Sequence, residues 1–282
     1  ALILDKVDIE ENAGKTPFNY TTPPGIQRER FYSSQFADIP QKFRLKQIPD
    51  MPASLSEQDT LGLMQAISLK NRTPRITLTG AGAYAHFIPA VASHIVGRAE
   101  FYTAYTPYQA EISQGILQTI YEYQTMIAQL TGTEIANASM YDGASAMAEA
   151  AVLCGKMSNR SRMVIARSVH PQYRQVLQTY CWANGYTLNE IPALPSGQLN
   201  LAALKNTLDD SVAAIILQSP NFFGCIEDIT PIADAAHQYG ALLIAGFTDG
   251  TSLGILQPAG ACGADFVVGE GQSFGNPLNY GG

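Results

Sequence analysis

The sequence predicts an α/β fold built around a doubly wound, mainly parallel sheet, and three observations support this. First, 282 residues, of which 46% are hydrophobic and 15% charged, are enough to bury a substantial core. Second, from Arg75 onward short strand-like runs alternate with helix-like segments and short turns. Third, most of these runs are continuously apolar, which is typical of parallel strands covered by helices on both faces.

The first 60 residues differ from the rest in composition and sequence pattern. They contain short polar and aromatic stretches interrupted by Pro17, Pro23, Pro24, Pro40, Pro49 and Pro52. Prolines at this density disfavour regular helices and central strands. We therefore expect an extended N-terminal arm over residues 1–60 and one large α/β domain over residues 61–282.

Three helices are predicted, each with a physical signal. Over 113–130, apolar residues recur at spacings of three and four, and Gly132 is a suitable C-terminal stop. Over 143–157, small residues follow the Asp142-Gly143 turn, so this helix can pack closely. Over 171–182, Pro171 suits the first turn of a helix.

Five strands are predicted, and each is a short apolar run between helices or turns. They cover Met163 to Arg167, Tyr186 to Ile191, Ala213 to Leu217, Ala241 to Gly246 and Asp265 to Val268.

Composition argues against several classes of partner. A net charge of -7 without a cluster of lysines or arginines argues against nucleic acid. No run of 18 apolar residues or secretory signal is visible, so we expect no membrane span and a cytoplasmic location. The histidines and cysteines lack metal-ligand spacing, so we expect no metal. The four widely spaced cysteines indicate reduced cytosolic thiols: Cys154, Cys181, Cys225 and Cys262.

A glycine-rich turn over residues 80–85 has the pattern G-x-G-x-x-A, and Glu100 lies where a ribose-binding acid would be in a nicotinamide-binding fold. Against that interpretation, Pro89 interrupts the expected helix and no buried strand precedes Glu100. A tight glycine turn is the alternative.

The start of the predicted helix at residue 143 has two interpretations. The backbone N–H groups of Gly143, Ala144 and Ser145 would point at whatever lies before the helix, as in phosphate sites. Alternatively this is an ordinary helix start capped by Ser139 or Asp142.

Two polar residues follow predicted strands, at the edge where parallel sheets bind ligands. His170 is either a ligand-contacting residue or a packed or exposed loop histidine. Asp249 could pair with a protonated ring nitrogen, or it could be a turn aspartate, because Asp-Gly is a common turn pair.

The glycine-rich segment 268–282 follows the last predicted strand. This is the place where a lysine would hold an aldehyde cofactor, yet the candidate position is Gln272 and no lysine occurs after Lys205. Without a lysine amine, this part of the chain cannot form a Schiff base with an aldehyde cofactor.

Several segments together resemble one family, the α subunit (subunit 1) of the glycine-cleavage P-protein, a decarboxylating glycine dehydrogenase. The resemblance covers residues 36–282. The matching segments are FADIP (36–40), GAGAY (80–84) with HFIP (86–89), EFYTAYTPYQ (100–109), EISQG (111–115), ASMYDGA (138–144) and VGEGQSFG (268–275).

The resemblance implies the large domain of a fold type I pyridoxal-phosphate (PLP) transferase, with a mainly parallel, seven-stranded-type sheet, ending before the C-terminal domain. It implies a cytoplasmic heterotetramer with a β subunit that carries the PLP lysine. This assembly is an oxidoreductase that decarboxylates glycine and passes the aminomethyl group to the lipoyl arm of H-protein.

Matched to the β subunit, Gln272 falls at the Schiff-base lysine, which makes this chain a noncatalytic half. The same match makes the other candidates a relic cofactor site: Gly143, Ala144 and Ser145 for the phosphate, His170 for ring stacking and Asp249 for the pyridine nitrogen.

Glycine- and tyrosine-rich loops lead us to expect that Tyr84, His86, Tyr105 and Tyr108 line the partner's pocket or the lipoyl channel. A purely scaffolding subunit that docks H-protein, and a nicotinamide-dependent oxidoreductase, are the alternatives.

Overall fold

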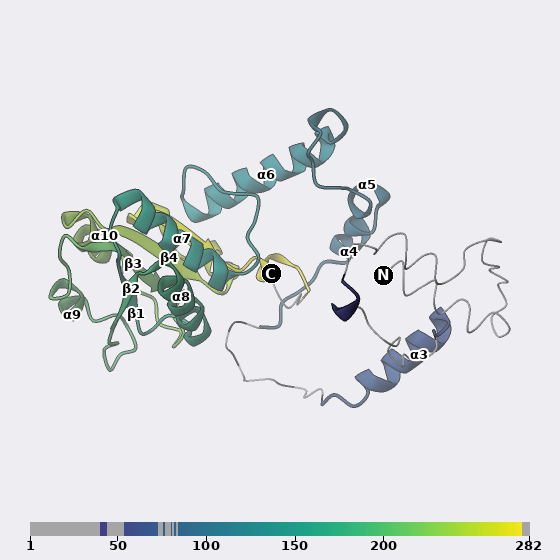
Figure 1. Ribbon diagram of the computed structural model, residues 1–282, viewed down its shortest axis with the longest axis horizontal. Coiled ribbons are helices and arrows are strands. Elements are labelled where there is room, and N and C mark those ends of the chain that lie inside the picture. Colours follow the sequence, from purple (N-terminus) through teal and green to yellow (C-terminus); the bar gives the residue numbers. More distant parts are fainter. Residues whose placement is uncertain are drawn as a thin grey trace. The chain divides into compact units, whose positions relative to one another are not determined.

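The computed structural model describes residues 40–43, 54–72, 76, 80, 82 and 84–277 (Figure 1). The chain divides into two compact units, Ala1–Thr77 and Leu78–Gly282. Residues 61–77 therefore group with the N-terminal segment, whereas the sequence places the division at residue 60. Most of the predicted arm, residues 1–39, lies outside the described residues.

The described part of the first unit contains a short 3-10 helix, η1 (Gln41–Phe43), and helix α3 (Glu57–Ser68). Ser56 caps α3, because its side chain accepts a hydrogen bond from the amide of Asp59. This helix is not among the predicted elements. It buries no residue within the described structure, although apolar residues recur on it at Leu61, Met64 and Ile67.

The second unit begins with helices and continues as an α/β domain. Its helices are α4 (Ala90–Val96), α5 (Ala99–Tyr102), α6 (Gln114–Thr131), α7 (Gly143–Ser158), α8 (Pro171–Asn184), α9 (Leu201–Lys205) and α10 (Ile229–Gln238). Its strands are β1 (Arg162–Ala166), β2 (Thr187–Ile191), β3 (Val212–Gln218), β4 (Leu242–Phe247) and β5 (Phe266–Gly269). Short 3-10 helices are η2 (Ala110–Ile112), η3 (Gly250–Gly254), η4 (Gly260–Cys262) and η5 (Gln272–Phe274).

The described strands form one parallel sheet in the order β2-β1-β3-β4-β5. This confirms the predicted α/β class and all five predicted strands, and within the described residues the sheet has five strands. The order reverses between β1 and β3. Parallel sheets bind ligands at such a switch point, beyond the carboxyl ends of the strands.

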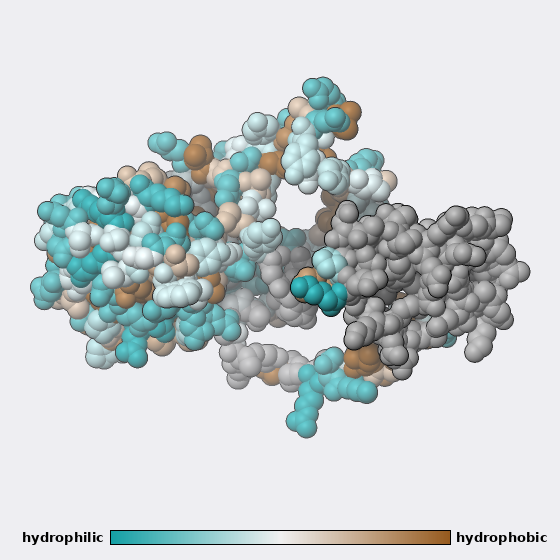
Figure 2. All heavy atoms as spheres, viewed as in Figure 1, coloured by the Kyte–Doolittle hydropathy of each residue, from teal (hydrophilic) through white to brown (hydrophobic). Residues whose placement is uncertain are grey.

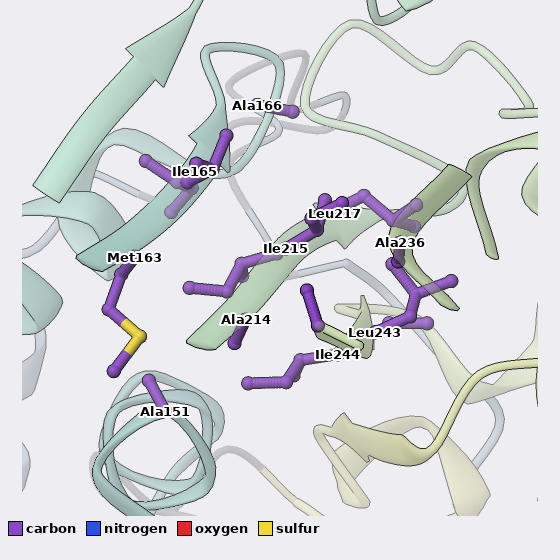
Figure 3. Close-up of a cluster of buried hydrophobic side chains, with 14 of the residues drawn as sticks. Ala151, Met163, Ile165, Ala166, Ala214, Ile215, Leu217, Ala236, Leu243 and Ile244 are labelled. Carbon is purple, nitrogen blue, oxygen red and sulfur yellow. The ribbon is translucent and has the colours of Figure 1, made fainter. Parts of the chain in front are cut away.

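The core lies between this sheet and the helices on its two faces. All seven residues of β3 are buried, and the first six of them are apolar, as expected for a central parallel strand. Met163 on β1 points toward Ala151 of α7, whereas Leu243 on β4 lies beside Ala236 of α10 (Figure 3). Figure 2 shows that hydrophilic and intermediate residues cover most of the visible face of this domain.

The three predicted helices are confirmed as α6, α7 and α8. Gly132 ends α6 in the left-handed conformation, with a φ of 71°. Only Ala128 and Thr131 of α6 are buried, so the apolar stripe predicted for this helix is only partly covered by the described residues. Helix α7, in contrast, buries most of its small residues against the sheet and α8.

Candidate functional site

The carboxyl edge of the sheet brings four of the sequence-predicted positions to one region of the α/β domain. Gly143 begins α7, His170 follows β1, Asp249 follows β4 and Gln272 follows β5. Parallel strands end at a common edge, so these separate segments converge although they span 130 residues of chain.

The start of α7 is capped by Asp142, not by Ser139. The Asp142 side chain accepts from the amide of Ser145 at 2.7 Å, and the Ser145 side chain accepts from the amide of Asp142, which completes a capping box. Asp142 is therefore the capping residue, one of the two that the sequence predicts for this role.

The amide of Gly143 donates to Oε1 of Glu270 at 2.8 Å. The same oxygen accepts the hydroxyl hydrogen of Tyr173 at 2.7 Å. Burial, then the hydrogen bond to Glu270, raise the pKa of Tyr173 above its ordinary value, so this hydroxyl stays a donor. A carboxylate of the chain itself thus lies at the positive end of α7.

His170 caps helix α8 and is almost fully buried, with 6% of its surface exposed. Its Nδ1 accepts from the amide of Gln172 at 3.2 Å, and its own amide donates to Oε1 of Gln218 at 2.9 Å. The ring packs against Tyr173 and Phe222, each at a centroid distance of 5.1 Å. The packed-histidine interpretation therefore describes its surroundings.

Asp249 caps the 3-10 helix η3. Its Oδ1 accepts from the amide of Thr251 at 2.9 Å and from the hydroxyl of the same residue at 2.7 Å. Although burial opposes the charge, these hydrogen bonds and the nearby His86 hold the pKa of Asp249 below its ordinary value. The turn interpretation of Asp249 is therefore borne out geometrically, and the structure brings His86 toward this carboxylate.

Gln272 lies in η5, directly after the loop that carries Glu270. Its Nε2 donates to the carbonyl of Asn276 at 3.0 Å, within its own turn. The neighbouring Ser273 accepts from the amide of Gly250 at 2.7 Å. These contacts bind the loop to itself and to η3, where Ser273 also hydrogen-bonds Asp249.

The four tyrosine and histidine residues of the N-terminal loops are not gathered into a pocket within the described residues. Tyr105 and Tyr108 are 80% and 82% exposed, and their rings lie 6.2 Å apart. Tyr84 is also exposed, whereas His86 is half-buried. A contribution to a partner's pocket stays a prediction.

The nicotinamide interpretation finds no support at Glu100. This residue lies on the short helix α5, exposed, and its carboxylate pairs with Arg98 at 2.7 Å. Hydrogen bonds from Arg98 lower its pKa to about 2. Pro89 precedes α4, as its expected role as a helix interrupter suggests, and most of the strand-like run before Gly80 lies outside the described residues.

Sequence reasoning missed two glutamates of this region. Glu270 escaped notice because its partners lie 127 and 97 residues away along the chain. Glu227 is 5% exposed and accepts from Ser168 at 3.0 Å, from Asn221 at 2.7 Å and from the amide of Leu199. It thereby joins the loops that follow β1, β2 and β3, at the switch point of the sheet. Its sequence neighbours, Ile226 and Asp228, give no clear signal of this burial.

Across the described ranges, no group of three or more histidine, cysteine, aspartate or glutamate residues has the arrangement of a metal site. No described helix is both long enough and apolar enough to cross a membrane.

The fold and the position of the site define the class to which this protein belongs, the fold type I large domain of PLP-dependent transferases. The sequence profile of the glycine cleavage system P-protein matches residues 31–282. The chain belongs to the glycine cleavage system P-protein family.

Named relatives agree with this assignment. The chain is 50% identical over 249 residues to a probable glycine dehydrogenase (decarboxylating) subunit 1 of Desulforamulus reducens, and 48% identical over 247 residues to that of Moorella thermoacetica. Each match covers 88% of this chain and 55% of the relative. The chain thus spans about half the length of the curated relatives it matches.

Solved structures give the same result. A crystal structure of glycine decarboxylase (P-protein) of the glycine cleavage system, in inhibitor-bound form, superimposes with a TM-score of 0.83 at 41% identity, covering 95% of this chain and 61% of that one. A sphingosine-1-phosphate lyase of Burkholderia pseudomallei matches with a TM-score of 0.54 at 13% identity, over 76% of this chain and 50% of that one, which shows the shared fold alone.

The fold class implies PLP, and the residues of this chain do not fit it. A phosphate ester needs free amides at a helix start, but the amide of Gly143 already donates to Glu270. A Schiff base needs an amine, and position 272 carries an amide side chain. His170 and Asp249 are likewise engaged by groups of the chain itself.

Proposed function

We propose that this chain is part of the α subunit of a glycine decarboxylase, the P-protein of a glycine cleavage system. In this proposal the αβ assembly is a cytoplasmic heterotetramer that decarboxylates glycine with PLP and transfers the aminomethyl group to lipoyl H-protein. Family membership and the naming of the relatives as subunit 1 support it.

The observation that carries the division of labour is Gln272. In the loop after β5, the position expected for the cofactor lysine carries the neutral side chain of Gln272, and the sequence has no lysine after Lys205. We therefore assign PLP to a lysine of the β subunit, where the cofactor supplies the electron sink for decarboxylation. This chain is then the noncatalytic half of the assembly.

A noncatalytic half can still shape the partner's pocket. Tyr105 and Tyr108 present large, exposed aromatic surfaces with a hydroxyl group, a combination enriched at interfaces. We assign these two residues, with Tyr84 and His86, to the wall of the β-subunit pocket or of the lipoyl channel.

The location of the cofactor is tested by reducing the assembled holoenzyme with borohydride and identifying the labelled peptide by mass spectrometry. We expect the pyridoxyl label on the β subunit alone. We also expect glycine decarboxylation to require both full-length chains. A label on this chain, or full activity of the β subunit without it, would contradict the proposal.

The wall is tested with Y108A in the assembled full-length enzyme. We expect glycine turnover to fall, or the KM for H-protein to rise, by at least roughly tenfold, which is about the effect of removing an aromatic contact. Y121A is the matched control, because Tyr121 is also an exposed tyrosine but lies on α6. Unchanged turnover and H-protein saturation in Y108A, at normal assembly, would favour a scaffold without contact to the reaction.

A further inference from the structure

The carboxylate of Glu270 lies where a phosphate ester would meet the start of α7. One of its oxygens, Oε1, accepts from the amide of Gly143 at 2.8 Å and from the hydroxyl of Tyr173 at 2.7 Å. An amide at a helix start and a hydroxyl are the donors that hold phosphate oxygens in proteins. Here an acidic side chain of the chain itself receives both.

The absence of a side chain at Gly143 permits this close approach. A Cβ at this position would collide with the Tyr173 hydroxyl and would lie 2.8 Å from Oε1 of Glu270. Tyr173 in turn is held between its helix α8 and the ring of His170. Glu270 is half-buried, and its Oε1 is in contact with fixed groups of α7 and α8.

A second anion cannot share this position. The sequence contains neither lysine nor arginine after Lys205, and Arg174, one residue from Tyr173, pairs with Glu190 at 2.6 Å. A phosphate ester entering beside Glu270 would therefore meet a like charge, and like charges at contact distance repel.

We propose that Glu270 is an internal replacement for the cofactor phosphate: its carboxylate occupies the start of α7 and closes this chain's own cofactor site. The closure also fastens the loop after β5, because Glu270 immediately follows that strand while Gly143 and Tyr173 belong to α7 and α8. This inference rests on the proposed role of the chain as the half of the assembly without a cofactor lysine.

The test uses the full-length αβ enzyme with PLP bound to the β subunit, and measures additional binding of radiolabelled inorganic phosphate by equilibrium dialysis. We expect one saturable additional site per αβ pair in E270A, and in the wild type binding at least roughly tenfold weaker that does not saturate over the same range, because E270A removes a like charge. E149A is the matched control. It removes one exposed glutamate from α7 itself, and should behave as the wild type.

Adding PLP and pyridoxal separately identifies the group that is recognised. A second equivalent of PLP, but not of pyridoxal, should bind E270A, because only PLP carries a phosphate. Equal phosphate binding in wild type and E270A, or no gain in a correctly assembled E270A enzyme, would overturn the inference.

E270Q covers the case in which E270A does not assemble. Glutamine keeps the shape and the accepting oxygen but removes the charge, so phosphate should bind E270Q more tightly than the wild type and more weakly than a folded E270A. No gain in E270Q would then overturn the inference. These readouts are independent of glycine turnover: if this chain proved dispensable for decarboxylation, the proposed function would fail while the phosphate result would still decide the role of Glu270.

Discussion

At the scale of single residues, the carboxylate of Glu227 is buried and accepts several hydrogen bonds. Its oxygens accept from the Ser168 hydroxyl, the Leu199 amide and the Asn221 side chain. Each donor comes from a different loop at the carboxyl edge of the sheet. A buried acceptor with this many donors is costly to replace, because every donor left without a partner loses its solvation as well.

We expect E227Q to lower the free energy of unfolding by about 2–3 kcal/mol. The glutamine NH₂ group cannot accept hydrogen bonds, so at least one of the donors that now contact Glu227 would lose its acceptor. Urea denaturation of the full-length chain measures this. E149Q, an exposed change of the same type, should stay within about 0.5 kcal/mol of the wild type. Equal stabilities of E227Q and E149Q would show that the three loops do not depend on this carboxylate.

At the scale of elements, the end of α6 is joined to the 3-10 helix η4 by two glycines. Gly132 ends α6 with a positive φ, and its backbone lies directly against Gly260. A Cβ on Gly260 would collide with the carbonyl group of Gly132 and would lie 2.9 Å from the carbonyl oxygen of Thr131. Backbone atoms cannot move aside as the end of a side chain can.

The substitution G260A should therefore separate α6 from η4 and lower stability by about 1–3 kcal/mol. G254A is its control, because a Cβ on Gly254 would meet open space and no positive φ is required there. We expect G254A to be neutral within about 0.5 kcal/mol. Thermal unfolding of both variants measures the difference, and similar melting temperatures would refute the close contact.

Elements with a strong local signal could be predicted from the sequence, and the others could not. Strand β3 has six consecutive apolar residues followed by Gln218, and α7 starts at an Asp-Gly turn, so the predicted bounds of both lie within one or two residues of the observed ones. Helix α10 was missed although it buries Ile229, Ile232 and Ala236 on one face, because Pro231 lies in its first turn and obscures the pattern. Short α4, α5 and α9 carry too few residues for a periodicity to show.

At the scale of the whole molecule, the site differs from its prediction for one reason. The predicted positions do converge at the sheet edge, since the parallel topology dictates it. The groups that engage them come from distant parts of the chain, such as Glu270 at Gly143, and a single sequence does not show such pairings. The sequence therefore predicts which positions meet at this edge, whereas their contacts with the chain's own side chains are seen only in the fold.

Two buried thiols in the layer between α7, α8 and the sheet should make the free energy of unfolding depend on pH. Cys154 on α7 and Cys181 on α8 are both buried. Burial raises the pKa of Cys154 to about 12, with the charge of Asp265 adding to the effect, and burial raises that of Cys181 to about 11. In the unfolded chain the pKa of a cysteine thiol is about 8.5. Between these values the unfolded chain releases protons that the folded chain retains.

The free energy of unfolding should therefore be unaffected by these thiols below about pH 8 and should fall as the pH rises above it. Between pH 8 and 9.5 we expect a loss of about 1 kcal/mol per thiol, and the onset of tyrosine ionisation in the unfolded chain near the top of this range is common to both proteins compared. The measurement is urea denaturation of wild type and of C154A/C181A across this range. The double variant starts from a lower stability because of its two cavities, but its stability should change less with pH. Parallel pH profiles for the two proteins would mean that the thiols do not stay protonated in the folded chain, and that solvent reaches the layer between α7, α8 and the sheet.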